Sequence, residues 1–369
     1  MDGRQLYYLV VFGAAIFAWL SQIIYRKTQK KTFIGVLLLV LSYSLLLFLL
    51  GTRVCGIGVD DRAYSNIFTK TTELGVGAVF ASTMIEPGYL LLNRLVGLFT
   101  SDYQVMIFIV SALSLVFVYA TLLSEIKSIN LFMAVLLFGM IIYPYYFGII
   151  RLSLAVSISF FATRYLIRGD RMKYNLMILL AASIHYSALI LLIMNIIIKK
   201  PLNLKTLKAF YVKLIIIIPV ALIAISALVI PSVGGRYSQY VLNTDFSLSI
   251  LDFDKIPIVL FGLFFMRIAE KRMRDYPLYL FLYSLAIIIT LCSVFVSFGR
   301  AEWYFNIYAC LVIPAVLSSL WNSEKERALS IILVPIFIAY GILYSDHLLD
   351  QKAHILFIDQ YDSVLFEDS

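Results

Sequence analysis

Charged residues are scarce in this chain. Only 14% of its 369 residues are Asp, Glu, Lys or Arg, whereas an average soluble domain carries about 25%. Hydrophobic residues reach 62%, and the mean hydropathy is +0.93. This composition excludes a soluble globular protein and indicates an integral membrane protein.

Cysteine and the common cofactor motifs are also rare or missing. The three cysteines, Cys55, Cys292 and Cys310, show no CxxC or metal-ligand spacing, so the sequence predicts neither a disulfide framework nor a zinc site. Gly56 and Gly58 permit a tight loop but carry no phosphate-loop signature. The acids of the same stretch form no D-x-D pattern, which argues against a metal and nucleotide-sugar site there.

Apolar runs recur from one end of the chain to the other. A membrane-spanning helix needs about 20 predominantly apolar residues, so the runs predict an all-α, polytopic bundle with about ten transmembrane helices. No linker or strong internal repeat divides the chain, which predicts a single domain over residues 1–369. The predicted spans are Leu6–Tyr25, Phe33–Leu50, Tyr103–Leu123, Leu131–Ile150, Leu152–Ile167, Tyr211–Ile230, Ile256–Ile268, Leu278–Phe298, Tyr304–Leu320 and Ala328–Tyr344.

Basic residues beside the spans set the predicted orientation. Arg26, Lys27, Lys30 and Lys31 follow the first run directly, which places that end in the cytoplasm and the N-terminus outside. Simple alternation of spans then works as far as Ile167.

The apolar run 174–198 conflicts with this alternation, because a single crossing would put Lys199 and Lys200 outside. A re-entrant hairpin removes the conflict, with arms Tyr174–Ile184 and Tyr186–Ile198 and His185 near the tip. Each arm is then about 17–20 Å long, too short to cross about 30 Å of hydrocarbon.

With that hairpin, the predicted cytoplasmic segments hold 20 of the 30 Lys and Arg but only six of the 22 Asp and Glu. The net charge of +8 is therefore explained mostly by orientation, and no nucleic-acid partner is predicted. The predicted external segments are the stretches 51–102 and 231–255 and an acidic tail, 346–369. Within the first, Glu86–Thr100 is apolar but short, which predicts an amphipathic helix on the outer membrane surface.

Four arginines break the basic-inside pattern, and all fall at the predicted outer mouth of the bundle: Arg53, Arg151, Arg236 and Arg300. Arginine carries a permanent charge and a planar fork that matches phosphate oxygens. The four residues predict an anionic, phosphorylated ligand at the lipid boundary. The alternative for each arginine is snorkelling to the lipid headgroups.

Candidate proton acceptors lie at the same mouth. Asp60 and Glu86 could act as a general base on a sugar hydroxyl, or they could pair with a neighbouring arginine such as Arg53 or Arg62. His185 could serve as a base or a hydrogen-bond donor, or it could be a packing residue. Tyrosines crowd this edge as belt residues or as stacking surfaces for sugars; the candidates for stacking are Tyr64, Tyr89, Tyr237 and Tyr304.

The order of these elements resembles the EpsG/Wzy family of bacterial polysaccharide polymerases, over roughly Gly51 to Pro314. Two departures stand out: Leu152 follows Arg151 where the family often has Gln, and Asp61 follows Asp60 where it often has Tyr, so the equivalent aspartate stays open. The matching elements are R-x-x-x-x-G-x-D with a following Tyr (Arg53, Gly58, Asp60, Tyr64), E-x-G-Y (Glu86, Gly88, Tyr89), IIRLSLAVSI (Arg151), SIHYSAL (His185, Ser187), R-Y-x-x-Y (Arg236, Tyr237, Tyr240) and R-x-x-W-Y-F (Arg300, Tyr304).

The resemblance implies a GT-C-like membrane glycosyltransferase on the outer face of the bacterial cytoplasmic (inner) membrane. Such enzymes join oligosaccharide repeat units carried on undecaprenyl diphosphate and need no nucleotide, metal or other cofactor. Membrane lipid surrounds them, and a chain-length regulator and a flippase are candidate partners.

Under this hypothesis Arg151 and Arg300, assisted by Arg53 or Arg236, bind the diphosphate. Glu86, Asp60 or His185 then takes the acceptor proton.

Three other functions compete with the polymerase. An O-antigen-type ligase has similar spans but usually one large late external loop, and the stretch 231–255 is modest. A flippase or transporter of lipid-linked sugars should show paired repeats or charges spread through the bundle, which this sequence lacks. A structural membrane protein would explain the spans but not the external arginines.

Overall fold

The computed structural model describes residues 3–30, 32–83, 85–198, 206–207, 255–293 and 299–351. Within this part of the chain every regular element is a helix, as the apolar runs predict. The predicted span Tyr211–Ile230, the external residues 231–254 and the tail residues 352–369 lie outside the described residues.

The elements of the first half, through the fifth predicted span, are α1 (Gly3–Thr28), α2 (Phe33–Gly51), α3 (Asp61–Leu74), α4 (Val76–Thr83), α5 (Pro87–Val96), α6 (Tyr103–Ser124), α7 (Leu131–Leu137), the π-helix η1 (Phe138–Ile142), α8 (Tyr143–Gly148) and α9 (Ile150–Ile167). The later elements are α10 (Arg171–Ile184), the 3₁₀-helix η2 (Tyr186–Leu191), α11 (Leu192–Ile197), α14 (Lys255–Phe264), α15 (Met266–Arg272), α16 (Tyr276–Ser293), α17 (Gly299–Asn306), α18 (Ala309–Trp321) and α19 (Arg327–Asp350).

Seven helical segments of the described chain are long and apolar enough to cross a membrane, and three shorter apolar helices accompany them. The chain is therefore a membrane protein of the multi-pass kind. The core is formed by the segments Leu131–Gly148 and Arg300–Trp321, because 94% of the residues in the apolar stretch of each are buried. In Phe33–Gly51 and Arg327–Asp350 only 28% of these residues are buried. The outer helices thus keep apolar faces for lipid. The total of about ten crossings stays a prediction.

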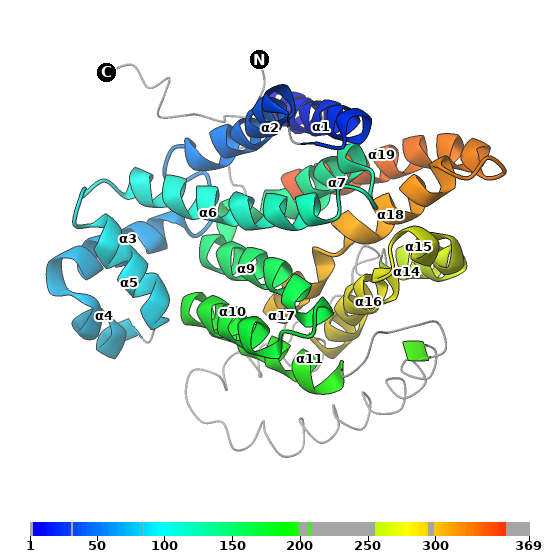
Figure 1. Cartoon of the computed structure of the whole chain (residues 1–369). Helices are drawn as coiled ribbons and strands as arrows, with labels where there is room; N and C mark the ends of the chain where they lie inside the picture. The colour runs from blue at the N-terminus through cyan, green and yellow to red at the C-terminus, as the bar shows by residue number, and fades with distance from the viewer. Residues whose placement is uncertain are drawn as a thin grey trace.

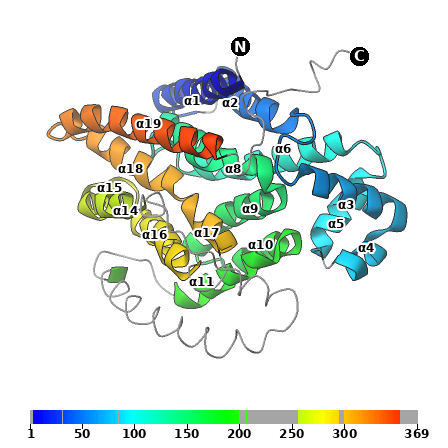
Figure 2. The same ribbon diagram turned by 180° about the vertical axis from the view of Figure 1, so that it is seen from behind.

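The connections gather at two ends of the bundle. At one end, Arg26 of α1 donates to the Ile129 carbonyl at 3.0 Å, and Arg272 of α15 donates to the Lys127 carbonyl at 2.9 Å. We call this the basic end. The helices α3, α4 and α5 lie together at the opposite end, beside the start of α6 (Figures 1 and 2). We call this the site end; which end faces the outside stays a prediction.

The predicted chain reversal at His185 is confirmed. Helix α10 stops before His185, whose backbone is extended (φ −152°, ψ 114°). The elements η2 and α11 then return along α10, where the Tyr174 hydroxyl donates to the Leu191 carbonyl at 2.9 Å. Near the open end of this hairpin, Asn195 Nδ2 donates to Asn175 Oδ1 at 2.9 Å. The depth of the hairpin in the membrane stays a prediction.

The stretch 51–102 contains more helices than the one that its sequence predicts. Besides the predicted helix near Glu86, which is α5, it contains α3 and α4. Helix α5 packs one face into the molecule, where Tyr89 and Leu90 are fully buried, and leaves the apolar Leu91 and Leu95 about half exposed. Its expected position on the membrane surface stays a prediction.

Candidate active site

Arg53 forms a fully buried ion pair with Asp61. Both side chains have no exposed surface, and Arg53 Nη2 lies 2.9 Å from Asp61 Oδ1. The same Nη2 donates to the Phe147 carbonyl at 3.0 Å, and Nη1 donates to the Leu50 carbonyl. Leu50 and Phe147 lie at the C-terminal ends of α2 and α8, where carbonyl groups lack helical partners and favour a cation.

Gly58 allows this buried pair to form. The amide of Gly58 donates to Asp61 Oδ2 at 2.8 Å. A Cβ atom at Gly58 would collide with the Phe147 carbonyl and lie 2.8 Å from Asp61 Oδ1, so only glycine fits. We call Arg53, Gly58, Asp61 and Phe147 the latch. Its geometry favours an architectural role for Arg53 over the predicted contact with diphosphate.

Arg151 forms a second arginine–carboxylate pair, with Glu86, at the wall of the site. The side chains are 14% and 8% exposed. Glu86 Oε2 accepts from Arg151 Nη1, and Glu86 Oε1 accepts from the Tyr186 amide at 3.1 Å. The carboxylate therefore ties α9 to the tip of the hairpin.

Two tyrosine rings hold the Arg151 guanidinium from its sides. The Arg151 Cζ atom lies 5.2 Å from the Tyr64 ring centroid and 5.5 Å from that of Tyr89, within the range of cation–π attraction. Both rings are almost fully buried. This geometry favours support of Arg151 by Tyr64 and Tyr89 over the predicted stacking on sugars.

Local backbone features explain how the second pair forms. The apolar run breaks at Ile149 (φ −110°, ψ 53°), so Arg151 falls in the first turn of α9. Glu86 is the N-cap residue of α5. A Cβ atom at Gly88 would lie 2.6 Å from the Ser183 carbonyl, so glycine lets α5 pack closely against the end of α10. That packing explains the E-x-G-Y spacing.

His185 belongs to a short hydrogen-bonded chain. Its Nδ1 lies 2.7 Å from Ser187 Oγ, and Ser187 Oγ lies 3.0 Å from the Tyr304 hydroxyl. The Tyr304 side chain is only 1% exposed, which favours a structural role in this chain over the predicted contact with sugar.

Asp60 and Arg300 are the more accessible charged groups of the site. Arg300 is exposed and Asp60 is half-buried, and neither forms an ion pair with a residue that the structure describes. Burial raises the pKa of Asp60 above its ordinary value, although Arg300, Arg151 and the Tyr64 hydroxyl act in the opposite direction. The positive charges of Arg151 and Arg300 also repel a positive charge on His185, so the three side chains share one electrostatic environment.

The structure therefore brings together most of the predicted site residues from distant parts of the chain. We call Asp60, Glu86, Arg151, His185 and Arg300 the site cluster. Arg236 and Tyr237 lie outside the described residues. In the part of the chain that the structure covers, no group of three His, Cys, Asp or Glu side chains could hold a metal ion.

Sequence reasoning missed three features of this region. It left open whether Asp60 or Asp61 is the equivalent of the family's aspartate, without foreseeing that Asp61 pairs with Arg53, and it gave Ser187 no role. It also missed an almost buried ion pair between Lys255 Nζ and Glu302 Oε1, at 3.0 Å. This pair joins the start of α14 to α17, the helix that carries Arg300. The signal was present in the sequence as a lysine at the end of the predicted external stretch 231–255 and an acid within the motif that includes Arg300.

Comparison with known proteins identifies the family. A sequence model of the EpsG family matches residues 36–353. The chain belongs to the EpsG family. This match covers every residue of the latch and of the site cluster, and it supports a polysaccharide polymerase-like enzyme of the membrane. No curated protein and no solved structure matches the chain.

Proposed function

We propose that this EpsG-family protein polymerises oligosaccharide repeat units linked to undecaprenyl diphosphate, on the outer face of the bacterial cytoplasmic membrane. The observation that carries the proposal is the site cluster. An exposed arginine, a fixed arginine and a half-buried carboxylate converge at one end of a bundle of apolar helices. A lipid-linked diphosphate presents its charge at this boundary between lipid and water.

Arg300 is the proposed primary ligand of the donor diphosphate. Its guanidinium is exposed and can offer a planar fork to two phosphate oxygens. Arg151 cannot move freely, because Glu86 and the two tyrosine rings hold it. A charge fixed in this way is suited to stabilise the negative charge that develops on the leaving diphosphate. Arg53 stays in the latch and does not touch substrate.

Asp60 is the proposed general base. Both oxygens of Glu86 already accept hydrogen bonds, and the Nδ1 atom of His185 is engaged by Ser187. Asp60 is accessible, and its raised pKa makes it a stronger base than an ordinary aspartate. His185, through its other ring nitrogen, is proposed to hydrogen-bond the acceptor sugar.

The proposed reaction is a glycosyl transfer. The acceptor hydroxyl oxygen forms a bond to the anomeric carbon of the donor chain while the bond from that carbon to the diphosphate oxygen breaks. The hydroxyl proton passes to Asp60, and undecaprenyl diphosphate leaves with both bonding electrons. The leaving group is activated already, so this step uses neither nucleotide nor metal.

The test is a reconstituted reaction of the full-length protein with undecaprenyl-diphosphate-linked repeat units as the only substrate. We expect glycan chains of increasing length and release of undecaprenyl diphosphate. Arg300→Ala should lower both products to a small residual level, and Arg300→Lys should retain somewhat more activity, because it keeps the charge but loses the fork. Arg62→Ala, at an exposed arginine of α3, is the matched control and should behave as wild type.

Three outcomes would contradict the proposal. Transfer of one preformed chain to a different acceptor without elongation would indicate a ligase. Movement of the lipid-linked unit between leaflets without formation of a glycosidic bond would indicate a transporter. Full elongation by Arg300→Ala would remove Arg300 from the site.

A further inference from the structure

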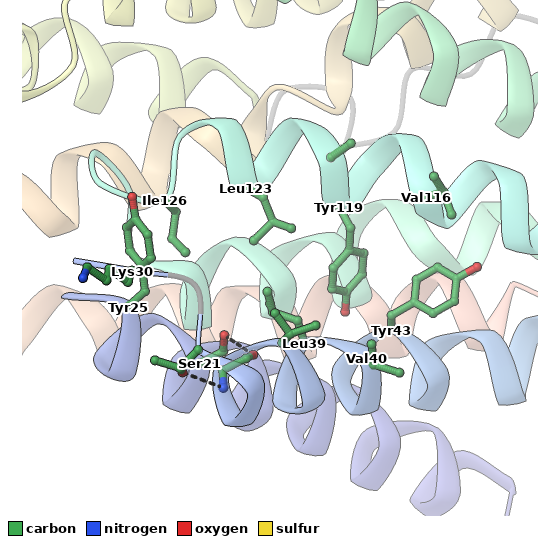
Figure 3. A pocket seen from close by; sticks show the side chains of 14 residues that line it. Ser21, Tyr25, Lys30, Leu39, Val40, Tyr43, Val116, Tyr119, Leu123 and Ile126 are labelled. Atoms are coloured by element: carbon green, nitrogen blue, oxygen red, sulfur yellow. Dashed lines mark hydrogen bonds between the residues drawn. The ribbon is translucent and has the colours of Figure 1, made fainter. Parts of the chain in front are cut away.

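A hollow lies at the basic end of the bundle, away from the site cluster. It is a cavity of about 490 Å³ between α2 and α6, closed from below by α1. Its walls come from one face of each helix: Leu39, Val40 and Tyr43 of α2 face Val116, Tyr119 and Leu123 of α6 (Figure 3). We call this cavity the α2–α6 groove.

The α2–α6 groove opens toward the membrane. Val36, Val40 and Val116 on its rim are 46%, 50% and 49% exposed, and α2 is one of the least buried helices of the bundle. In a bilayer these side chains meet hydrocarbon, so the occupant of the groove is apolar along this length.

The groove extends over about half of a bilayer. From Thr32 to Tyr43 its wall on α2 covers about 16 Å at 1.5 Å per residue, and a hydrocarbon core is about 30 Å thick. Tyr43 closes the inner end, because its hydroxyl donates to the Ala112 carbonyl of α6 at 3.0 Å. A chain that lies in the groove therefore belongs to one leaflet.

The open end of the groove is basic. Lys30 lines the cavity beside Tyr25 (Figure 3), and it is exposed, as is Lys27. Among the described residues Lys30 forms no ion pair. Its charge is therefore available to an anionic headgroup.

We propose that the α2–α6 groove binds one anionic phospholipid of the leaflet at the basic end. One acyl chain lies along the groove as far as Tyr43, and the headgroup phosphate lies beside Lys30. The length of the groove argues against a long polyprenyl chain that crosses both leaflets. The lysine argues against a zwitterionic lipid as the preferred occupant, because a basic residue near the headgroups favours anionic lipids.

Native mass spectrometry of the full-length protein tests this proposal. Phosphatidylglycerol and phosphatidylcholine with the same acyl chains are titrated separately. We expect phosphatidylglycerol to bind at least about fivefold more tightly, the effect expected of one basic residue near the headgroup. Lys30→Ala should lower that affinity about fivefold and leave the phosphatidylcholine affinity unchanged. Lys325→Ala, at an exposed lysine between α18 and α19, is the control and should have no effect.

A second pair of variants tests the apolar part. Ala120→Phe fills the groove from α6 and should prevent binding of the lipid, whereas Leu113→Phe enlarges a lipid-facing side chain of the same helix outside the groove and should not. Equal binding of the two lipids, or unchanged affinity in Lys30→Ala, would overturn the proposal. Displacement of phosphatidylglycerol by undecaprenyl phosphate would assign the groove to the polyprenyl chain instead. None of these measurements depends on polymerase activity.

Discussion

Two arginine–carboxylate pairs at the site end, Arg53–Asp61 and Arg151–Glu86, look alike in the sequence and differ in their surroundings. Arg53 and Asp61 have no exposed surface, and their remaining hydrogen bonds go to the backbone. Arg151 and Glu86 keep a small exposed area and lie between aromatic rings and the hairpin tip. The first pair joins helix ends, and the second holds a charge at the edge of an accessible site. Burial, rather than residue type, distinguishes the two pairs.

The largest expected effect is on folding, at the latch. Arg53→Ala leaves Asp61 buried without its counter-ion, which typically costs about 3–5 kcal/mol. We expect a large fall in the unfolding temperature of the purified protein in detergent. Arg94→Ala, which removes an exposed arginine that donates to the Thr72 carbonyl, is the control and should change it little. An Arg53→Ala protein as stable as wild type but inactive would instead support the predicted contact with diphosphate.

The second prediction concerns the pair at the site. Glu86→Gln removes the charge that orients Arg151, so we expect polymerisation to slow about 100-fold, the typical cost of losing one preorganised charge-stabilising group. The unfolding temperature should change much less than in Arg53→Ala.

The exchange Glu86→Arg with Arg151→Glu sharpens this test. The exchanged protein should have nearly the unfolding temperature of wild type but should not polymerise repeat units, because the positive charge then lies on α5 instead of α9. Recovery of activity by the exchanged pair would show that Arg151 acts only as a structural partner of Glu86.

A smaller effect is expected at Ser187. Ser187→Ala removes the hydrogen bond to His185 Nδ1 and frees the imidazole to turn. A hydrogen bond of this kind contributes about 0.5–1.5 kcal/mol, so kcat should fall about three- to tenfold with the unfolding temperature nearly unchanged. Ser183→Ala, near the end of α10, is the control. A fall in stability with unchanged kcat would make Ser187 a packing residue.

The smallest predicted effect is a displacement of the pH profile. If Asp60 is the base, activity is lost as the pH falls through its pKa, because protonated Asp60 cannot accept a proton. Arg300 lowers that pKa, so the residual activity of Arg300→Gln should be lost at a higher pH than in wild type. Arg62→Gln should leave the acidic limb in place. A profile of Arg300→Gln that coincides with wild type would exclude Asp60 as the base.

Much of the fold could be predicted because every membrane-spanning helix must be apolar and long enough to cross the same thickness of hydrocarbon. The spans Phe33–Leu50 and Tyr103–Leu123 agree with α2 and α6 within one residue at either end. The break at His185 could be predicted because a single crossing by residues 174–198 would put Lys199 and Lys200 outside, against the basic-inside pattern. The extra helices α3 and α4 escaped prediction, because their sequences are not long apolar runs.

The candidate site could be predicted only as a set of residues. Charge patterning placed Arg53 and Arg151 in one group, and the structure separates them by burial. That separation depends on where the Phe147 carbonyl lies relative to Gly58, and no local pattern encodes this distance. The choice between Asp60 and Asp61 has the same cause, because only the fold decides which carboxylate meets Arg53.

The latch also has a consequence for the order in which the chain is assembled. Arg53 and Asp61 are eight residues apart and can pair as soon as the stretch that follows α2 has been synthesised. The Phe147 carbonyl lies 94 residues after Arg53, so it arrives only after two further apolar segments have been synthesised. Since the N-terminal part of a chain folds first during synthesis, the Arg53–Asp61 pair is available before α8 exists, and the latch is complete only after α8 has reached the site end.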